Sequence, residues 1–357
     1  LVNRSKSRAR TILIIGIAAK SFLIILPLFQ NPVYYIVCIA MGAYLDSLLL
    51  SIWNIVFKHN YTQENRSRLY SYATSIQTIF VLAVSTASGY FLDLNGQLYK
   101  VLFPVAGVFG IAVYYSLAKM VSLSMDDYHG RTRTGKTHYS ARLLKDIAVL
   151  PVRNTIRIFR ENRPFLRFEA YFFLYGMAFM VLSPVLPIYL VDNLKMNYAP
   201  ISLAKGFVFH SALILFTPLM GRFHGTGNPT KFCGYVFSIL ALFPLMMISA
   251  GYLSSAGIIP DMNITVYISF FIFGFAMSGV TIAWALSSIF YAPKNEVSNY
   301  QAVHITLTGV RGLFSPALGY AVMRLLEIEY TFYLSSFLFL FGGFMMYRES
   351  KKFSESK

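Results

Sequence analysis

Five ionisable side chains lie inside long apolar stretches of this chain, where a charge is costly. Lys20, Asp46, His210 and Arg311 fall near the middle of four such stretches, and Glu169 lies about one turn from the end of a fifth. An ionisable residue at the centre of a bilayer costs about 2.5–3.5 kcal/mol on insertion scales, and such residues usually mark a pathway for an ion, a proton or a solute. These five residues are therefore the first candidates for chemistry inside a membrane.

Each of these residues also has a purely structural interpretation. Lys20 and Asp46 can neutralise one another as a fixed pair. His210 can be a hydrogen-bonded interior histidine, and Glu169 can bridge Arg167 or the arginines that precede it at the level of the lipid headgroups. The sequence alone leaves both interpretations open.

Arg311 carries the strongest binding chemistry of the group. It lies directly before Gly312 and five residues before Pro316, too deep in its apolar stretch to reach either headgroup layer easily. Its guanidinium offers a fork suited to a carboxylate or a phosphate. It could bind an anionic solute group or form a permanent salt bridge, with Asp46 as the partner. The charges of Lys20, Arg311 and Asp46 together favour an anion slightly.

Aromatic residues form a second set of candidates. Trp53 and Trp284 are the only tryptophans, and Tyr171 and Tyr175 lie one turn apart on one predicted helix. These rings either line a solute cavity or act as interfacial and packing residues.

The elements that must position these residues are membrane-spanning helices. Hydrophobic residues make up 56% of the chain and charged residues only 13%, whereas a soluble domain carries about 25% charged residues. A helix needs roughly 17–25 apolar residues to cross a bilayer. The chain is therefore predicted to be an all-α polytopic membrane protein with ten transmembrane helices, at 12–29, 33–56, 70–92, 101–120, 167–190, 200–220, 232–252, 264–291, 301–324 and 330–347.

The net charge of +16 is explained by topology. If the spans alternate, 25 of the 31 Lys and Arg residues fall on the side that holds both ends of the chain. Positive residues concentrate on the cytoplasmic side of membrane proteins, so both termini are predicted to be cytoplasmic, with the chain in the cell membrane. The basic charge then has lipid headgroups as its partner, and no nucleic-acid-binding module accompanies it.

Landmarks recur at a long, nearly constant interval. "STASGY" at 85–90 matches "SPALGY" at 315–320, 230 positions later, and the two tryptophans lie 231 positions apart. Spans one to four therefore correspond in order to spans seven to ten, as expected for a duplicated transporter half. Gly and Pro in these repeated stretches permit close helix approach and bending.

Three loop and helix motifs carry a family resemblance: "ENRSR" (64–68), "GRFHGTGNP" (221–229) and "GLFSPALG" (312–319). With the repeat, they resemble the signatures of the major facilitator superfamily, although Ser67 replaces a Gly, and Gly225 and Thr226 stand where Asp and Arg are expected. The resemblance marks as structural or gating residues Lys20, Glu64, Arg66, Arg68, Gly89, Gly221, Arg222, Gly312, Pro316 and Gly319.

The resemblance implies two six-helix halves joined by a cytoplasmic loop. We expect an N-terminal half at 1–120, a linker at 121–165, a C-terminal half at 166–349 and a tail at 350–357. Spans five and six lack counterparts, so the pattern is four helices plus six. The sequence then predicts that two helices, roughly 55–70 residues, are missing from the first half and that these 357 residues alone do not transport.

The linker carries two amphipathic segments, "SARLLKDIAVL" and "RNTIRIFREN", on either side of Pro151. Their basic and apolar residues are typical of helices that lie in the headgroup plane. We expect them to brace the protein laterally, with a regulatory docking site as the alternative.

The function implied by the resemblance is secondary active transport of a small solute by alternating access. Asp46, Glu169, His210 and Arg311 would then fall on helices that face the central cavity. Protons are the expected coupling ion, with Asp46 or Glu169 as the carrier and His210 as the relay. The chain has no nucleotide-binding loop, and we expect no cofactor, no metal and a monomer. The alternatives are a sensor with a transporter-like body and a membrane-embedded enzyme, whose catalytic motifs we do not find.

Overall fold

The computed structural model describes residues 8–60, 63–125, 141–226, 228–258, 261–293 and 296–355, and of residues 50–75 and 141–148 it describes the backbone only. Every regular element in these residues is a helix, so the predicted all-α class is confirmed. The chain divides into two compact units, Leu1–His138 and Tyr139–Lys357.

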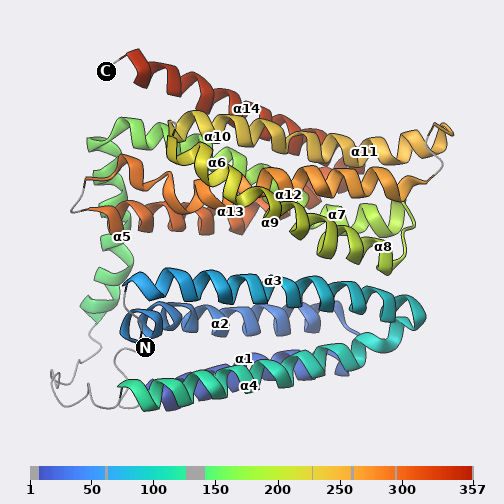
Figure 1. The fold of residues 1–357 in the computed structure, drawn as a ribbon, viewed down its shortest axis with the longest axis horizontal. Helices are drawn as coiled ribbons and strands as arrows, with labels where there is room; N and C mark the ends of the chain where they lie inside the picture. The colour runs from blue at the N-terminus through green and yellow to red at the C-terminus, as the bar shows by residue number, and fades with distance from the viewer. Residues whose placement is uncertain are drawn as a thin grey trace. The chain divides into compact units, whose positions relative to one another are not determined.

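The first unit contains four long helices that run side by side (Figure 1). They are α1 (Arg8–Ile25), α2 (Pro32–Asn60), α3 (Gln63–Leu94) and α4 (Tyr99–Met125), with short 3-10 turns at Leu26–Leu28 and Gly96–Leu98. Asn31 caps α2, because its Oδ1 accepts hydrogen bonds from the amides of Val33 and Tyr34 at 2.9 and 3.2 Å. Such caps satisfy the free amides of a helix start.

Helices α1 and α4 pack closely through two glycines. A Cβ at Gly16 would overlap the ring of Tyr114, and a Cβ at Gly110 would lie 2.7 Å from the Lys20 side chain. Small residues at such contacts let two helix backbones approach within a membrane. The glycines thus make room for two side chains that recur in the site below.

The second unit contains more helices than the first, and several of them are short. It comprises α5 (Ala141–Glu161), α6 (Arg163–Leu182), α7 (Val185–Ile188), α8 (Tyr198–Ser202), α9 (Phe209–Thr226), α10 (Pro229–Leu240), α11 (Leu242–Ser255), α12 (Met262–Leu286), α13 (Val297–Leu325) and α14 (Ile328–Glu355). Two π turns, Tyr189–Asn193 and Leu203–Val208, continue α7 and α8. Phenylalanines dominate its core, including Phe165, Phe168, Phe172, Phe237 and Phe339.

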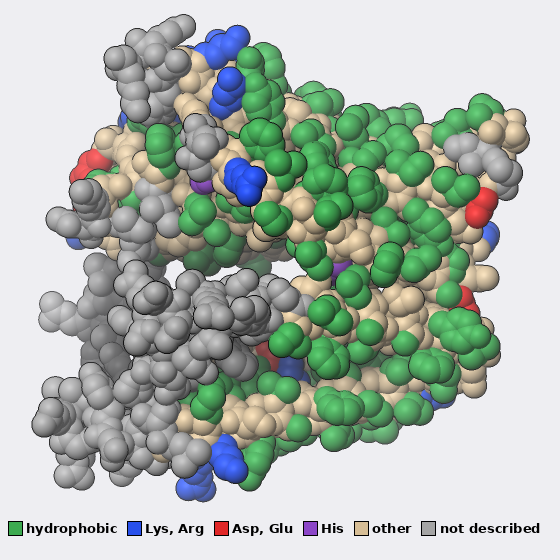
Figure 2. Space-filling model, viewed as in Figure 1, with side chains coloured by type: hydrophobic (Ala, Val, Ile, Leu, Met, Phe, Trp, Pro, Cys, Tyr) green, Lys and Arg blue, Asp and Glu red, His purple; other side chains and the backbone are tan. Residues whose placement is uncertain are grey.

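Nine segments among the described residues are long and apolar enough to cross a membrane, so the polytopic prediction is confirmed. On the face shown in Figure 2, hydrophobic side chains cover much of the described surface of each unit. Exposed large apolar side chains such as Phe80, Phe109 and Leu313 suit contact with lipid rather than water. The remaining predicted span, 301–324, coincides with α13, a helix of 29 residues that is sufficiently long but more polar.

The linker forms one helix instead of two segments around Pro151. Helix α5 continues through this proline from Ala141 to Glu161. The fixed φ of proline is compatible with a helix, although the ring removes one backbone hydrogen bond and crowds the carbonyl four residues earlier. Burial of Ile158, which is 1% exposed, anchors the second part of the helix to the core of its unit.

An ion-pair network fastens α5 to the start of α13. Arg157 donates to Glu296 at 2.8 Å, to Glu161 at 2.9 Å and to Asn154 at 2.9 Å. Hydrogen bonding from Arg157 lowers the pKa of Glu296 below its ordinary value, and the same bond raises the pKa of Arg157. These groups lie outside the candidate spans, so solvent and salt reach them.

Because the pKa of Glu296 is lowered by folding, its contribution to stability is present above the ordinary glutamate pKa. It is lost as the pH falls through the lowered value. We expect the difference in apparent unfolding temperature between the wild type and Glu296→Gln to be largest at neutral pH and to close on acidification. Thermal unfolding of both proteins across an acid pH series measures this difference. A gap that stays constant down to strongly acidic pH would refute the assignment.

Candidate functional site

The most buried ionisable residues of the second unit meet where α6 packs against α13. Asn162 positions the start of α6: its Oδ1 accepts from the Phe165 amide at 3.0 Å, and its Nδ2 donates to the Tyr291 carbonyl at 2.9 Å. The first two turns of α6 therefore have a fixed orientation relative to the segment that leads into α13. Glu169 lies at the end of these turns.

Glu169 and His304 form a buried acid–imidazole pair. Nδ1 of His304 lies 2.9 and 3.0 Å from the two carboxylate oxygens of Glu169, and the side chains are only 1% and 2% exposed. The rings of Phe172 and Trp284 lie 4.7 and 5.8 Å from the imidazole. A carboxyl and an imidazole at this distance can exchange one proton between them with little movement of either residue.

Arg311 lies on the same face of α13, two turns further along. It is 5% exposed, and its Nη1 donates to the Phe172 carbonyl at 2.9 Å. Its guanidinium carbon lies 6.0 and 5.7 Å from the rings of Phe172 and Tyr175. A Cβ at Gly176 would overlap the guanidinium, so only glycine at this position leaves room for it.

Three polar atoms along this face of α13 have no hydrogen-bond partner among the described residues. They are Nε2 of His304, Nε of Arg311 and Oγ of Ser315. Residues at i, i+7 and i+11 share one face of a helix, and buried polar groups of folded proteins almost always have a partner. This face is therefore available to a proton, a solvent molecule or a polar solute group.

The first unit contains a different arrangement. Nζ of Lys20 lies 2.6 Å from Oδ2 of Asp46, and the hydroxyl of Tyr114 donates to Oδ1 at 2.9 Å. Both oxygens of Asp46 are thus engaged by residues of α1 and α4. The pair lines a cavity of about 200 Å³ with Cys38 and apolar side chains of α1 and α2. The geometry matches the structural interpretation of Lys20 and Asp46.

Lys20→Met should destabilise the protein by roughly 1.5–3 kcal/mol, because Asp46 would lose its charged partner at membrane depth. The double variant Lys20→Met/Asp46→Asn should recover much of this loss, since it leaves no unpaired charge. Thermal unfolding of the two single variants and the double variant measures the coupling. Additive losses would show that the two residues do not stabilise each other.

A comparison of the sequence with models of known protein families identifies the family of this chain. The model of the Major Facilitator Superfamily matches residues 2–304, most of the chain. The chain belongs to the major facilitator superfamily. A search of curated proteins returned no match.

Of the predicted motif residues in α13, Gly319 has a clear packing role. A Cβ at Gly319 would overlap the backbone oxygen of Val181, so this glycine brings α13 and α6 together. A Cβ at Gly312 would meet only Met180, at an ordinary 3.8 Å, and Pro316 lies inside the helix.

The other motif residues are less informative. Gly89 is buried in α3, a Cβ at Gly221 would lie 3.8 Å from Ile282, and Arg222 is exposed in α9. The side chains of Trp53, Glu64, Arg66 and Arg68 lie outside the described residues.

The remaining candidates of this superfamily member are separated from the acid–imidazole pair or pack around it. Nδ1 of His210 lies 2.8 Å from the Gly206 carbonyl and 3.1 Å from the Lys205 carbonyl, in the π turn that precedes it. Tyr175 stacks on Phe237 with ring centroids 4.2 Å apart. Two candidates are more accessible: Tyr171 is half-buried at the edge of the core, and Trp284 is 37% exposed beside His304.

Sequence reasoning missed His304 and the partner of Arg167. Arg167 pairs at 2.6 Å with Glu349, which is buried, so the interpretation in which Arg167 neutralises Glu169 is wrong. His304 lies only three residues into its predicted span, where a polar residue is usually interfacial. Its spacing of seven residues from Arg311 was the signal that could have identified it.

Proposed function

We propose that this major facilitator superfamily protein is a secondary active transporter of a small solute, driven by a proton gradient through alternating access. The observation that carries the coupling is the buried contact of Glu169 with His304 at 2.9 Å. The pair is neutral overall when both residues are charged and gains a charge when it takes up one more proton. In a low-dielectric interior such a change alters the energy of the conformation strongly.

Glu169 is a better proton carrier than Asp46 for a geometric reason. A proton that binds Asp46 must compete with the Lys20 ammonium on one oxygen and the Tyr114 hydroxyl on the other. Glu169 is instead paired with an imidazole, a group that can itself accept and donate a proton. We therefore assign the relay to His304 in place of His210, whose contacts are to its own helix.

The proposed solute is a small molecule with an anionic group. Arg311 supports this assignment for two reasons. Its Nε has no partner among the described residues, and its side chain is the most buried of the described Lys and Arg residues. The ring faces of Phe172 and Tyr175 screen it in the described conformation. Solute access would therefore require the rings of α6 to move away from α13 within the second unit, in addition to the movement between halves that alternating access involves.

The proposed setting is the cell membrane, with both ends of the chain in the cytoplasm and the protein acting as a monomer. The concentration of Lys and Arg in one set of connections supports this orientation.

Uptake of candidate organic anions by the full-length protein in proteoliposomes, with and without an imposed pH gradient, tests the proposal. We expect accumulation against the solute gradient that collapses when a protonophore is added. Facilitated flux that the protonophore does not change would overturn proton coupling but would still support transport. The absence of flux for anionic, neutral and cationic panels would favour a sensor.

A further inference from the structure

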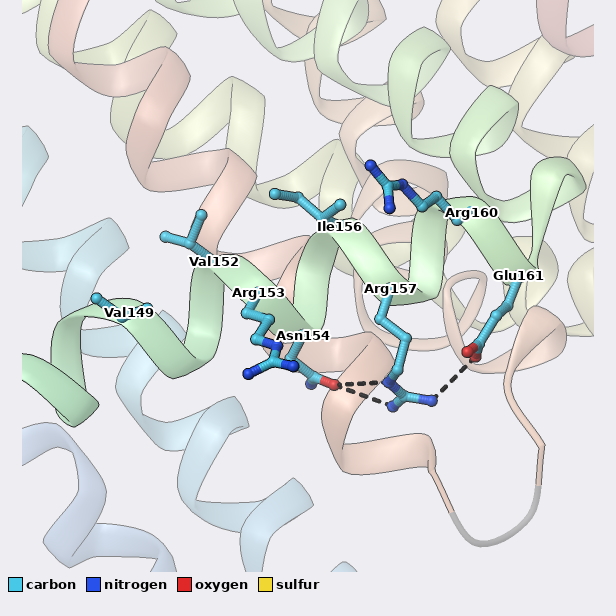
Figure 3. A pocket seen from close by; sticks show the side chains of 8 residues that line it. All are labelled: Val149, Val152, Arg153, Asn154, Ile156, Arg157, Arg160 and Glu161. Atoms are coloured by element: carbon cyan, nitrogen blue, oxygen red, sulfur yellow. Dashed lines mark hydrogen bonds and ion pairs between the residues drawn. The ribbon is translucent and has the colours of Figure 1, made fainter.

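Helix α5 presents an unusual outer face. Val149, Val152 and Ile156 are 49%, 60% and 47% exposed, although α5 belongs to a compact unit. Figure 3 shows Val152, Ile156 and Arg160 pointing to one side of the helix, away from Arg157 and Glu161. Three branched aliphatic side chains in a row, left in contact with water, would be unfavourable by about 25 cal/mol for each Å² of apolar surface.

Basic residues are interleaved with these aliphatic side chains. Arg153 and Arg160 line the same hollow beside α5 as Val149, Val152 and Ile156, and neither arginine forms an ion pair with a residue that the structure describes. Figure 3 shows Arg160 on the same side of the helix as Val152 and Ile156, and Arg153 beside Asn154 on the other side, so the aliphatic face has cationic side chains within it and next to it.

Among the described side chains of α5, Arg157 already has acidic partners. Arg157 is held by Glu161 and Glu296, which lie to the side of this face. The outer face thus keeps an excess of positive charge that an anionic partner can neutralise.

The position of α5 in its unit fits a lipid surface. Only Asn162 separates its last residue, Glu161, from the candidate span that begins at Arg163. Figure 1 shows α5 lying across the ends of the helices of its own unit. An amphipathic helix that runs across the start of a membrane span lies at the depth of the headgroups.

We propose that the outer face of α5 binds anionic phospholipids, with Arg153 and Arg160 contacting headgroup phosphates and Val149, Val152 and Ile156 inserted among the glycerol and upper acyl groups. The long arginine stems reach the phosphate layer while the aliphatic side chains stay below it. A lipid surface satisfies both halves of this face, because it offers negative charge and apolar material within one side-chain length. This binding is independent of the proposed transport activity.

The test is the immersion depth of a nitroxide attached at Val152→Cys. The two native cysteines, Cys38 and Cys233, are buried and leave the label selective. The labelled protein is placed in nanodiscs of pure phosphatidylcholine or of an equimolar mixture with phosphatidylglycerol. We expect the ratio of oxygen to nickel-chelate accessibility to rise several-fold in the mixed discs.

Two charge variants decide whether α5 itself recognises the lipid. Arg153→Gln/Arg160→Gln should abolish the rise, and added salt should weaken it in the parent protein. Arg348→Gln/Lys351→Gln removes the same charge from exposed positions of α14 and should leave the rise intact. An equal ratio in both lipids would overturn the proposal. A label shielded from both reagents in both lipids would also overturn it, because the face would then be covered by protein.

Discussion

Glu169→Gln is expected to abolish accumulation driven by a pH gradient while solute exchange across the membrane continues. Glutamine has nearly the same shape and can still contact His304, which lies 2.9 Å from the carboxylate. It cannot bind and release a proton, however, so the transport cycle loses its link to the gradient. Uptake and counterflow of the same labelled solute in one preparation of proteoliposomes measure the two activities separately.

Glu161→Gln is the matched control for this substitution. Its side chain is 60% exposed, and its ion pair with Arg157 lies on the surface of α5. Accumulation by this variant should remain close to wild type, since exposed ion pairs contribute little. Full accumulation by Glu169→Gln would remove Glu169 from the coupling step, and loss of both uptake and counterflow would show that it is needed for binding or folding instead.

Gly319→Ala is expected to lower the stability of the protein more than a single added methyl group ordinarily does. The new Cβ would overlap the backbone oxygen of Val181. Because this obstacle is backbone, relief requires α13 to move away from α6. Overpacking of this kind costs about 1–3 kcal/mol, and more where the helices cannot separate. Thermal unfolding in detergent, followed by protein aggregation or intrinsic fluorescence, measures the loss.

Gly309→Ala provides the control within the same helix. A Cβ at this position would meet nothing within 4 Å, and Ala is favoured over Gly in a helix by up to about 1 kcal/mol. This variant should be as stable as the wild type or more stable. Equal unfolding temperatures for the two variants would show that α6 and α13 are not packed through Gly319.

The movement of α13 away from α6 in Gly319→Ala should also change the functional site. Arg311 and His304 lie on the face of α13 that packs on α6, so a shift at Gly319 lengthens their contacts with Phe172 and Glu169. Reduced proton-driven uptake by protein that remains folded would accompany the loss of stability.

Much of the fold could be predicted from the sequence because a membrane imposes a simple requirement. Apolar length predicted ten spans, and nine of them overlap the candidate spans among the described residues, some of which comprise two or three consecutive helices. The π turns at Tyr189–Asn193 and Leu203–Val208 could not be predicted, since they interrupt helices without a change of composition. The uninterrupted α5 was also missed, because tertiary contacts at Ile158 outweigh the local effect of Pro151.

Most residues of the site could be predicted individually from the sequence, but only some of the contacts between them could. Lys20 and Asp46 lie in consecutive spans joined by a short connection, so their similar depth makes a contact between them foreseeable. Glu169 and His304 are 135 positions apart. Their contact depends on which faces of α6 and α13 meet, and glycines at 176 and 319 decide this through close packing. No repeating pattern within α6 or α13 specifies which of their faces meet.

The polar face of α13 also bears on how the chain enters a membrane. An arginine at the centre of a helix adds about +2.5 to +3.5 kcal/mol to the free energy of insertion, and α13 carries His304 and Arg311 in the same segment. Its acceptors, Glu169 and the Phe172 carbonyl, belong to α6, which is synthesised more than a hundred residues earlier. During biogenesis α13 therefore meets α6 already embedded in the bilayer. Contacts of His304 and Arg311 with α6 then offset the unfavourable free energy of inserting α13.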